Sequence, residues 1–265
     1  MKRRLLFALL VVATTIAMAG NKKEKVIFQD DFNSSNPVPN PKVWKLCEPF
    51  KVAWAQHFEH VKGYENVKVE DGYLKLKANK ADGHYKTGGI KTINGFDKNT
   101  KVEVRAKLTK RARGAFPAIW QMPIGGLSWP KSGEIDLMEW VQDTPMEMYQ
   151  TVHTHYVNGE TGTAGATNPN RDLNFDITQF HVYGAERTDD AVIFYVDGKE
   201  TYRYENMHLE KEKLQFPFCD FKFNLILNCS LGGTLNGNKT WAGEIHDEEL
   251  PVEMWVDWVK VVKTK

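Results

Sequence analysis

The sequence predicts an all-β fold in which two antiparallel sheets pack against each other. Hydrophobic and polar residues alternate over many short segments, and residues that favour turns separate these segments. No segment carries the periodicity of a long amphipathic helix, and residues 209–214 offer at most one helical turn. Many short strands divided by turns are typical of a β-sandwich.

Residues 1–19 are predicted to be a signal peptide and not part of the fold. A basic start at Lys2, Arg3 and Arg4 precedes an apolar stretch, which ends in an A-x-A cleavage pattern at residues 17–19. This stretch is shorter than the roughly 20 residues that a membrane-spanning helix needs, and no later segment could span a bilayer. We therefore expect a secreted or periplasmic protein, and the form of the signal indicates a bacterial source.

Residues 20–265 are expected to form one domain and to act as a monomer. No linker, repeat or low-complexity tract divides them, and all-β sandwiches of this length are commonly single domains. The net charge of +1, with both signs interspersed, gives no basic stripe for nucleic acid. Cys47, Cys219 and Cys229 are odd in number, so at least one lacks an intramolecular partner, and the sequence does not choose a pair. Cys229 ends an apolar strand and is expected to be a buried small hydrophobe.

Several segments carry particularly clear strand patterns. The clearest are residues 73–76, 101–108, 191–196, 221–227 and 254–262. Strict alternation in residues 101–108 puts four apolar side chains on one face. Asp71 and Gly72 precede residues 73–76, and Asp197 and Gly198 follow residues 191–196; an Asp-Gly pair beside a strand predicts a tight hairpin.

The most informative segment is residues 133–140, G-E-I-D-L-M-E-W, because its polar positions are all acidic. Side chains alternate between faces along a strand, so Glu134 and Asp136 share one face. An uninterrupted strand would put Glu139 on the apolar face, where an unpaired carboxylate is costly. A β-bulge at Leu137 and Met138 would return Glu139 to the face of the other two acids.

Three carboxylates on one strip of sheet would raise at least one pKa. A protonated acid beside an ionised one is the arrangement that glycoside hydrolysis uses. A solvated acidic strand face and a calcium site are the alternatives, and the full string disfavours both.

The segment E-I-D-L-M-E closely resembles the active-site strand of glycoside hydrolase family 16. Its extra residue, Met138, matches the bulged branch, which includes laminarinases, agarases, carrageenases, porphyranases and related endo-β-galactosidases. Further ordered matches lie at residues 87–90, 102–106, 114–120, 180–186, 194–198, 225–228, 232–233 and 256–259. The resemblance implies a β-jelly-roll with a substrate cleft along its concave face.

The resemblance also implies roles for the three acids in retaining hydrolysis. Glu134 would be the nucleophile and Glu139 the acid/base, with their carboxyl groups about 5–5.5 Å apart. Asp136 would hydrogen-bond the nucleophile and carry a negative charge that keeps Glu139 protonated. Catalysis would need no cofactor. Asp257 matches a position where the family often uses an Asp for a structural calcium.

Aromatic side chains near the acids are candidates for stacking on sugar rings. Trp129, just before the acidic strand, is the best candidate, whereas Trp120 could lie in the core or in the cleft. Trp140 should point away from the acids into the core, because it follows Glu139. Trp241 lies in the polar loop 236–243 and is a candidate for a subsite carried by that loop.

Polar candidates lie on two further predicted strands. His153 and His155 share one face of the strand after the acidic one, and His155 is the preferred candidate for binding the sugar or tuning Glu139. Asn224 and Asn228 lie on the polar side of their strand; Asn228 is a candidate sugar ligand, and simple solvation is the alternative for both.

Three functions follow from these observations. The first is a secreted endo-hydrolase of the laminarinase type that cuts β-1,3-glucan. The second is the same machinery acting on a galactose polymer, including poly-lactosamine in mucin glycans. The third, a sugar-binding jelly roll without catalysis, is disfavoured because binding alone does not need three acids. Three features depart from the laminarinase pattern, so the sugar specificity stays open. Laminarinases usually carry Trp at the position of Phe116 and often an apolar residue at that of Gln121, and residues 141–148 lack a laminarinase signature.

Overall fold

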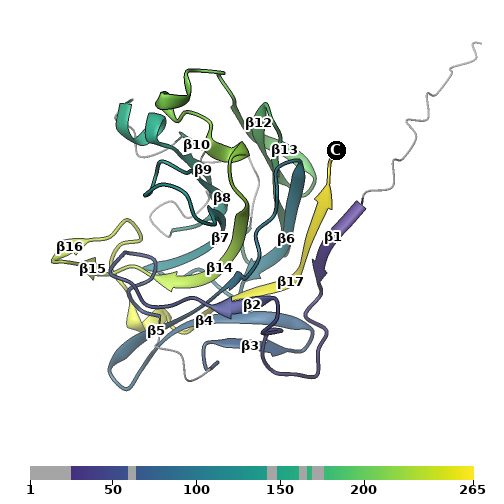
Figure 1. The fold of residues 1–265 in the computed structure, drawn as a ribbon. Coiled ribbons are helices and arrows are strands. Elements are labelled where there is room, and N and C mark those ends of the chain that lie inside the picture. The colour runs from purple at the N-terminus through teal and green to yellow at the C-terminus, as the bar shows by residue number, and fades with distance from the viewer. Residues whose placement is uncertain (1–24, 59–63, 142–147, 161–165, 169–175) are drawn as a thin grey trace, which may run out of the picture.

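The computed structural model describes residues 25–58, 64–141, 148–160, 166–168 and 176–265 (Figure 1). The predicted signal peptide and residues 142–147 of the segment after Trp140 lie outside this part of the chain. Within it, no helix has both the length and the apolar character to cross a membrane.

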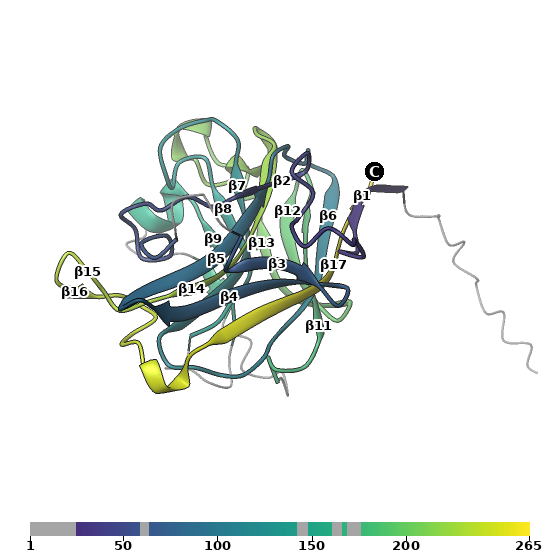
Figure 2. The same ribbon diagram turned by 90° about the horizontal axis from the view of Figure 1, so that it is seen from below.

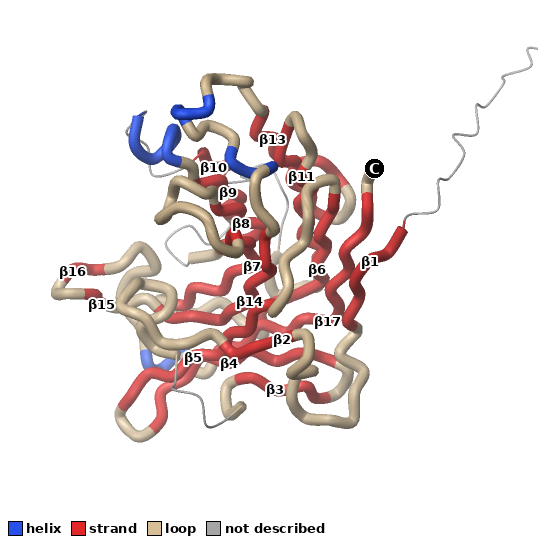
Figure 3. Tube along the Cα trace, viewed as in Figure 1, coloured by secondary structure: helices blue, strands red, loops and turns tan. Residues whose placement is uncertain are grey.

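Strands dominate the described residues, and the helices are single turns at the periphery (Figure 3). The strands are β1 Lys25–Asp30, β2 Trp44–Leu46, β3 Val67–Glu70, β4 Tyr73–Ala81, β5 His84–Thr92, β6 Thr100–Leu108, β7 Ala115–Pro123, β8 Glu134–Glu139, β9 Tyr149–His153, β10 Ala166–Asn168, β11 His181–Arg187, β12 Ala191–Val196, β13 Lys199–Glu205, β14 Phe223–Leu231, β15 Thr234–Leu235, β16 Asn238–Lys239 and β17 Val252–Lys263. A π-helical turn spans Tyr156–Glu160, and 3-10 turns span Lys211–Lys213, Pro217–Cys219 and Asp247–Glu249.

The strands form a curved antiparallel sandwich, as predicted (Figures 1 and 2). One layer runs β10-β9-β8-β7-β14-β5, and the other continues β4-β17-β6-β11-β12-β13. The β4–β5 hairpin links the layers, while β2 extends the first layer beside β5. Across the core, β8 faces β11 and β14 faces β17. The acidic strand β8 therefore lies within a sheet and is held by neighbours on both sides.

The predicted strand patterns are largely confirmed. β6 alternates buried and half-buried residues along its whole length. Asp197 and Gly198 have φ values of 50° and 79°, as a type I′ hairpin requires, and Asp71 and Gly72 behave in the same way. β14 begins at Phe223, so Phe221 precedes the strand. All three cysteines are free thiols, and Cys229 is fully buried as expected.

Candidate active site

The bulge predicted in the acidic strand is present in β8. Against β7, Met138 pairs with Ile119 and Asp136 pairs with Trp120, so Leu137 has no partner. Against β9, the register shifts between Asp136 and Glu139. The pairing thus identifies Leu137 as the extra residue, whereas the resemblance had indicated Met138. The side chains of Leu137 and Met138 are both buried in the core. The bulge therefore lets two adjacent apolar residues face the core and returns Glu139 to the face of the other acids.

Glu134 is held by the loop that precedes it. The indole N–H of Trp129 donates a hydrogen bond of 2.8 Å to Glu134 Oε2. The buried Ser132 closes this loop, because its hydroxyl oxygen accepts a hydrogen bond of 2.6 Å from the Leu127 N–H. Gly133 has a φ of +85°, and a Cβ there would lie 2.7 Å from the Phe218 ring. Only glycine therefore fits between the loop and Glu134.

Burial and mutual charge raise the pKa of each acid. Burial raises the pKa of Glu134 to about 7, and hydrogen bonds from Trp129 and Asp136 oppose the rise. Burial and the charge of Glu134 raise the pKa of Glu139 to about 8. Burial and its two acidic neighbours hold the pKa of Asp136 well above its ordinary value. Glu134 is therefore the first acid to ionise, and Glu139 keeps its proton longer.

These shifts correct one expectation about Asp136. A charged Asp136 was expected to keep Glu139 protonated, but its carboxyl is almost wholly buried and favours the neutral form. As a neutral acid it donates a hydrogen bond to Glu134. The charge that raises the pKa of Glu139 comes from Glu134 itself. The hydrogen bond from Asp136 thus favours the ionised form of Glu134.

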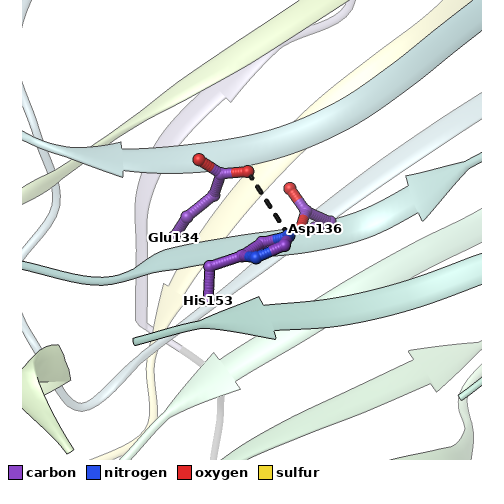
Figure 4. A group of neighbouring side chains, drawn as sticks. All are labelled: Glu134, Asp136 and His153. Atoms are coloured by element: carbon purple, nitrogen blue, oxygen red, sulfur yellow. Dashed lines mark ion pairs between the residues drawn. The ribbon is translucent and has the colours of Figure 1, made fainter. Parts of the chain in front are cut away.

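His153 lies beside two of these acids, Glu134 and Asp136, as Figure 4 shows. Its Nε2 lies 3.6 Å from Asp136 Oδ2 and 3.9 Å from Glu134 Oε1. Burial lowers the pKa of His153, so the ring is neutral at neutral pH. From the sequence, His155 was the preferred candidate over His153. In the structure, β9 ends at His153, and the chain enters a helical segment at His155. The structure therefore brings His153, and not His155, to the acids.

Asn158 determines which nitrogen of His153 carries the proton. The Thr154 N–H donates a hydrogen bond of 3.1 Å to Asn158 Oδ1, which fixes the orientation of the amide. The amide nitrogen then faces His153 Nδ1 at 3.0 Å and donates to it. Because Nδ1 accepts, the neutral ring carries its proton on Nε2, and this proton points toward the two carboxyl groups.

A cavity of about 600 Å³ begins at Glu134 and extends across the sheet. Trp120 and Trp129 line it, so both lie in the cleft; Trp129 is 55% exposed. Its remaining walls are mostly apolar and include Phe50 and Trp54, which reach the cleft from the loop after β2. An apolar cavity with few polar groups is the usual form of a ligand site, and exposed aromatic rings suit the C–H faces of sugars.

Asn228 does not bind substrate directly in this arrangement. Its side chain is fully buried, and Oδ1 accepts a hydrogen bond of 2.7 Å from the Trp120 indole N–H. Its amide nitrogen donates to the Phe116 carbonyl oxygen and the Ser230 hydroxyl. The amide is therefore committed to the protein, and Asn228 orients Trp120. Trp140 is fully buried in the core, as predicted.

Trp241 does not line this cavity and packs on two aromatic rings instead. The indole is 49% exposed. Its ring lies 5.4 Å from that of Phe116 and 5.0 Å from that of Tyr149, both in edge-to-face geometry. Tyr149 pairs with Glu139 across β8 and β9. The loop thus brings an exposed aromatic ring near the strand residue that pairs with Glu139, and a subsite carried by this loop stays a prediction.

The residues around Asp257 do not fit a calcium site. Asp257 lies at a bulge in β17, and its carboxylate forms an ion pair with Arg105 of β6. In the described part of the chain, it belongs to no cluster of metal-ligating side chains. A guanidinium at the carboxylate replaces the charge that a cation would supply. Glu134, Asp136 and His153 do form such a cluster. The hydrogen bonds and contacts among these side chains, described above, already account for their closeness.

The sequence missed four contributors to this site. Phe50, Trp54 and Lys91 line the cavity, and Asn158 orients His153. The first two lie in a loop without periodicity, so no pattern could place them. Lys91 pairs with Ile226, and Ile226 pairs with Trp120 on the next strand. The sequence alone does not show which strands are neighbours, so it could not place Lys91 at the cavity.

Comparison with known proteins agrees with this geometry. The family model "Glycosyl hydrolases family 16" matches residues 54–259. A keratan-sulfate endo-1,4-beta-galactosidase of Sphingobacterium multivorum is 33% identical over 96% of this chain, which spans 58% of that relative's length.

Two solved structures share the fold. One, described as "Prominent members of the human gut microbiota express endo-acting O-glycanases to initiate mucin breakdown", is 60% identical, with a TM-score of 0.88, and the match covers 91% of this chain and 100% of that one. The other is a mutant of SCLam, a non-specific endo-beta-1,3(4)-glucanase with a sugar at its active site; it is 30% identical, with a TM-score of 0.76, over 91% of this chain and 95% of that one. The chain described here belongs to glycoside hydrolase family 16.

Proposed function

We propose that this chain is an endo-β-galactosidase that cuts internal β-1,4 bonds of galactose-containing glycans, such as the poly-lactosamine stretches of mucin glycans. The observation that carries the proposal is its 60% identity to the O-glycanase structure, against 30% for the glucanase structure. The match to a keratan-sulfate endo-1,4-beta-galactosidase over 96% of the chain supports the same substrate class. Phe116, which stands where laminarinases usually carry Trp, packs against Trp241.

The arrangement of acids supports a double displacement. An oxygen of ionised Glu134 attacks the anomeric carbon, the glycosidic C–O bond breaks, and Glu139 gives its proton to the leaving oxygen. The hydrogen bonds from Trp129 and Asp136 favour the ionised nucleophile. Glu139, now ionised, then takes a proton from water, which attacks the glycosyl ester and frees Glu134. The sugar leaves with its original β configuration.

The substrate proposal is tested by digesting a panel of glycans and sizing the products. Poly-lactosamine and mucin glycans should be cut to oligosaccharides, whereas laminarin and mixed-linkage glucan should stay intact. Glu134→Gln serves as the control, because an amide of the same shape cannot form the glycosyl ester. Efficient cleavage of laminarin without cleavage of poly-lactosamine would contradict the proposed substrate and favour the laminarinase alternative.

We further propose that the chain is exported and acts as a monomer. Residues 1–19 carry the features of a cleavable signal, and a mucin glycan lies outside the cell. Amino-terminal sequencing of the protein from its natural source should begin close to Gly20, and light scattering should give the mass of one chain. Retention of residues 1–19 in the mature protein would contradict export by signal cleavage.

A further inference from the structure

Two lysines are paired on neighbouring strands, and one of them lines the catalytic cavity. Lys91 of β5 lines the cavity together with Asn224, Ile226 and Phe50. Lys45 of β2 pairs directly with Lys91 across the two antiparallel strands. Directly paired residues project to the same face of a sheet, with their Cβ atoms about 5 Å apart. Two positive charges are thus held side by side at the cleft.

The strand register puts this pair on the same face as the catalytic acids. Asp136 pairs with Trp120, Trp120 with Ile226, and Ile226 with Lys91. Because neighbouring strands lie about 4.8 Å apart, Lys91 is about 14 Å from β8 along the sheet. The same cavity is lined by Glu134 and by Lys91. A glycan that occupies the cavity from the nucleophile outward would therefore pass the lysines.

Neither ammonium group is paired with an acid in the described part of the chain. Among these residues, no carboxylate lies within 4.0 Å of the Lys45 or Lys91 ammonium group, and the exposed Glu48 nearby forms no ion pair with either. Two other cross-strand lysine pairs occur among the described residues, Lys25 with Lys263 at the end of the strand pair β1–β17 and Lys68 with Lys75, and the pair Lys68–Lys75 provides a contrast.

In the pair Lys68–Lys75, Lys75 contacts Asp71 at 2.7 Å and Glu70 at 3.0 Å, so acids offset the repulsion. Like charges directly opposite each other destabilise a sheet. The uncompensated pair at the cleft is therefore a feature that a bound anion would stabilise.

We propose that Lys45 and Lys91 form a subsite for a negatively charged substituent, a sulfate ester or a carboxylate, on a sugar of the bound glycan. The inference rests on the proposed function, because galactose-containing glycans of the keratan and mucin type carry such groups whereas laminarin is neutral. The relative from Sphingobacterium multivorum is named for keratan sulfate, and an anionic substrate agrees with that name. The subsite makes charge on the substrate a determinant of specificity.

The test compares charged and uncharged forms of one substrate. Keratan sulfate and its chemically desulfated form supply the sulfate arm; sialylated lactosamine oligosaccharides and their sialidase-treated forms supply the carboxylate arm. The double variant Lys45→Gln/Lys91→Gln removes both charges, Lys91→Arg keeps the charge at that position, and Lys68→Gln is a matched control on the exposed face of β3.

The double variant should raise KM for the charged form about tenfold, since a hydrogen bond to a charged group is worth at least that factor. The kcat on the charged form should change much less than KM, and the KM for the uncharged form should rise much less than that for the charged form, although Lys91 lines the cavity that both forms enter. The difference should disappear near 1 M salt, where the screening length falls to about 3 Å. Lys91→Arg and Lys68→Gln should behave as the wild type.

The outcomes separate this subsite from the proposed function. An effect on the sulfated substrate alone, or on the sialylated substrate alone, supports the subsite and identifies the group that it binds. Equal losses on charged and uncharged forms, or no loss on either, would overturn the subsite while poly-lactosamine cleavage by the wild type still stands. Failure of the wild type to cut any poly-lactosamine would overturn the proposed function and the subsite together.

Discussion

Replacing Glu139 by Gln should stabilise the fold while it removes the proposed acid/base. Burial and the charge of Glu134 raise the pKa of Glu139 from 4.5 to about 8. Between these two values the folded chain holds a proton that the unfolded chain has lost, so stability falls as the pH rises. At pH 7, about 2.5 pH units above the ordinary value, this effect costs about 3 kcal/mol as an upper figure. The amide of Gln has the same shape as the carboxyl group and does not ionise, so the variant avoids this loss of stability.

The assay is thermal unfolding of both proteins between pH 4 and pH 9. For a chain of this size, about 3 kcal/mol corresponds to a rise in Tm of about 6–12 °C at neutral pH. The advantage of Glu139→Gln should be absent near pH 4, grow as the pH rises through neutrality, and level off above about pH 8. The exposed Glu212→Gln serves as a control and should shift Tm little at any pH. Equal melting temperatures of wild type and Glu139→Gln across the range would refute the proposed electrostatics of the site.

Three further predictions follow from the same geometry. Deleting Leu137 should remove the bulge but leave Glu134, Asp136 and Glu139 at alternate positions on one face, so a folded variant should keep activity, whereas deleting Leu137 and Met138 together should turn Glu139 to the opposite face and abolish it; comparable activity in the two variants would contradict the role assigned to the bulge. Asn158→Asp should move the His153 proton from Nε2 to Nδ1, visible in ¹⁵N shifts of the ring, and lower kcat about tenfold; an unchanged tautomer would contradict the assigned hydrogen bond. The pH profile of kcat/KM should fall below about pH 7 as Glu134 gains a proton and above about pH 8 as Glu139 loses its proton; a rate that keeps rising through pH 9 would contradict these roles.

The bulge was predictable because two simple rules conflict in a short string. Alternation would put Glu139 in the core, and burial of an unpaired carboxylate forbids that position. One extra residue resolves the conflict, and the register confirms it. Which residue lacks a partner was not predictable, since Leu137 and Met138 are both apolar and both buried. Local sequence thus determines that a bulge exists, and the neighbouring strand determines its position.

The prediction for Asn228 was wrong because a strand face that carries polar residues is not always exposed to solvent. Alternation correctly placed its side chain away from the main core. The segment after β2, however, covers this face: the Ser230 hydroxyl donates to the Trp54 carbonyl oxygen at 2.6 Å, and the Trp54 ring lies 4.8 Å from that of Trp120. A contact between segments so distant in the sequence leaves no periodic signal, so the chain alone could not reveal it.

The preference for His155 over His153 failed for a local reason. Continued alternation puts both on one face, but the strand stops at His153. Thr154 then accepts a hydrogen bond of 3.1 Å from the Val157 N–H through its hydroxyl and begins the helical segment. A threonine in this position is a recognised helix-start signal. This part of the site was therefore predictable from the sequence, had the threonine been weighed against the strand pattern.

The most direct test of the account is an NMR time course of poly-lactosamine digestion by the wild-type protein. Cleavage after galactose with both acids on one bulged strand should release new reducing ends that appear first as the β-anomer of galactose and only later equilibrate. That result would support both the proposed substrate and the double displacement through Glu134. First appearance of the α-anomer would contradict the mechanism, and an intact polymer would contradict the proposed substrate.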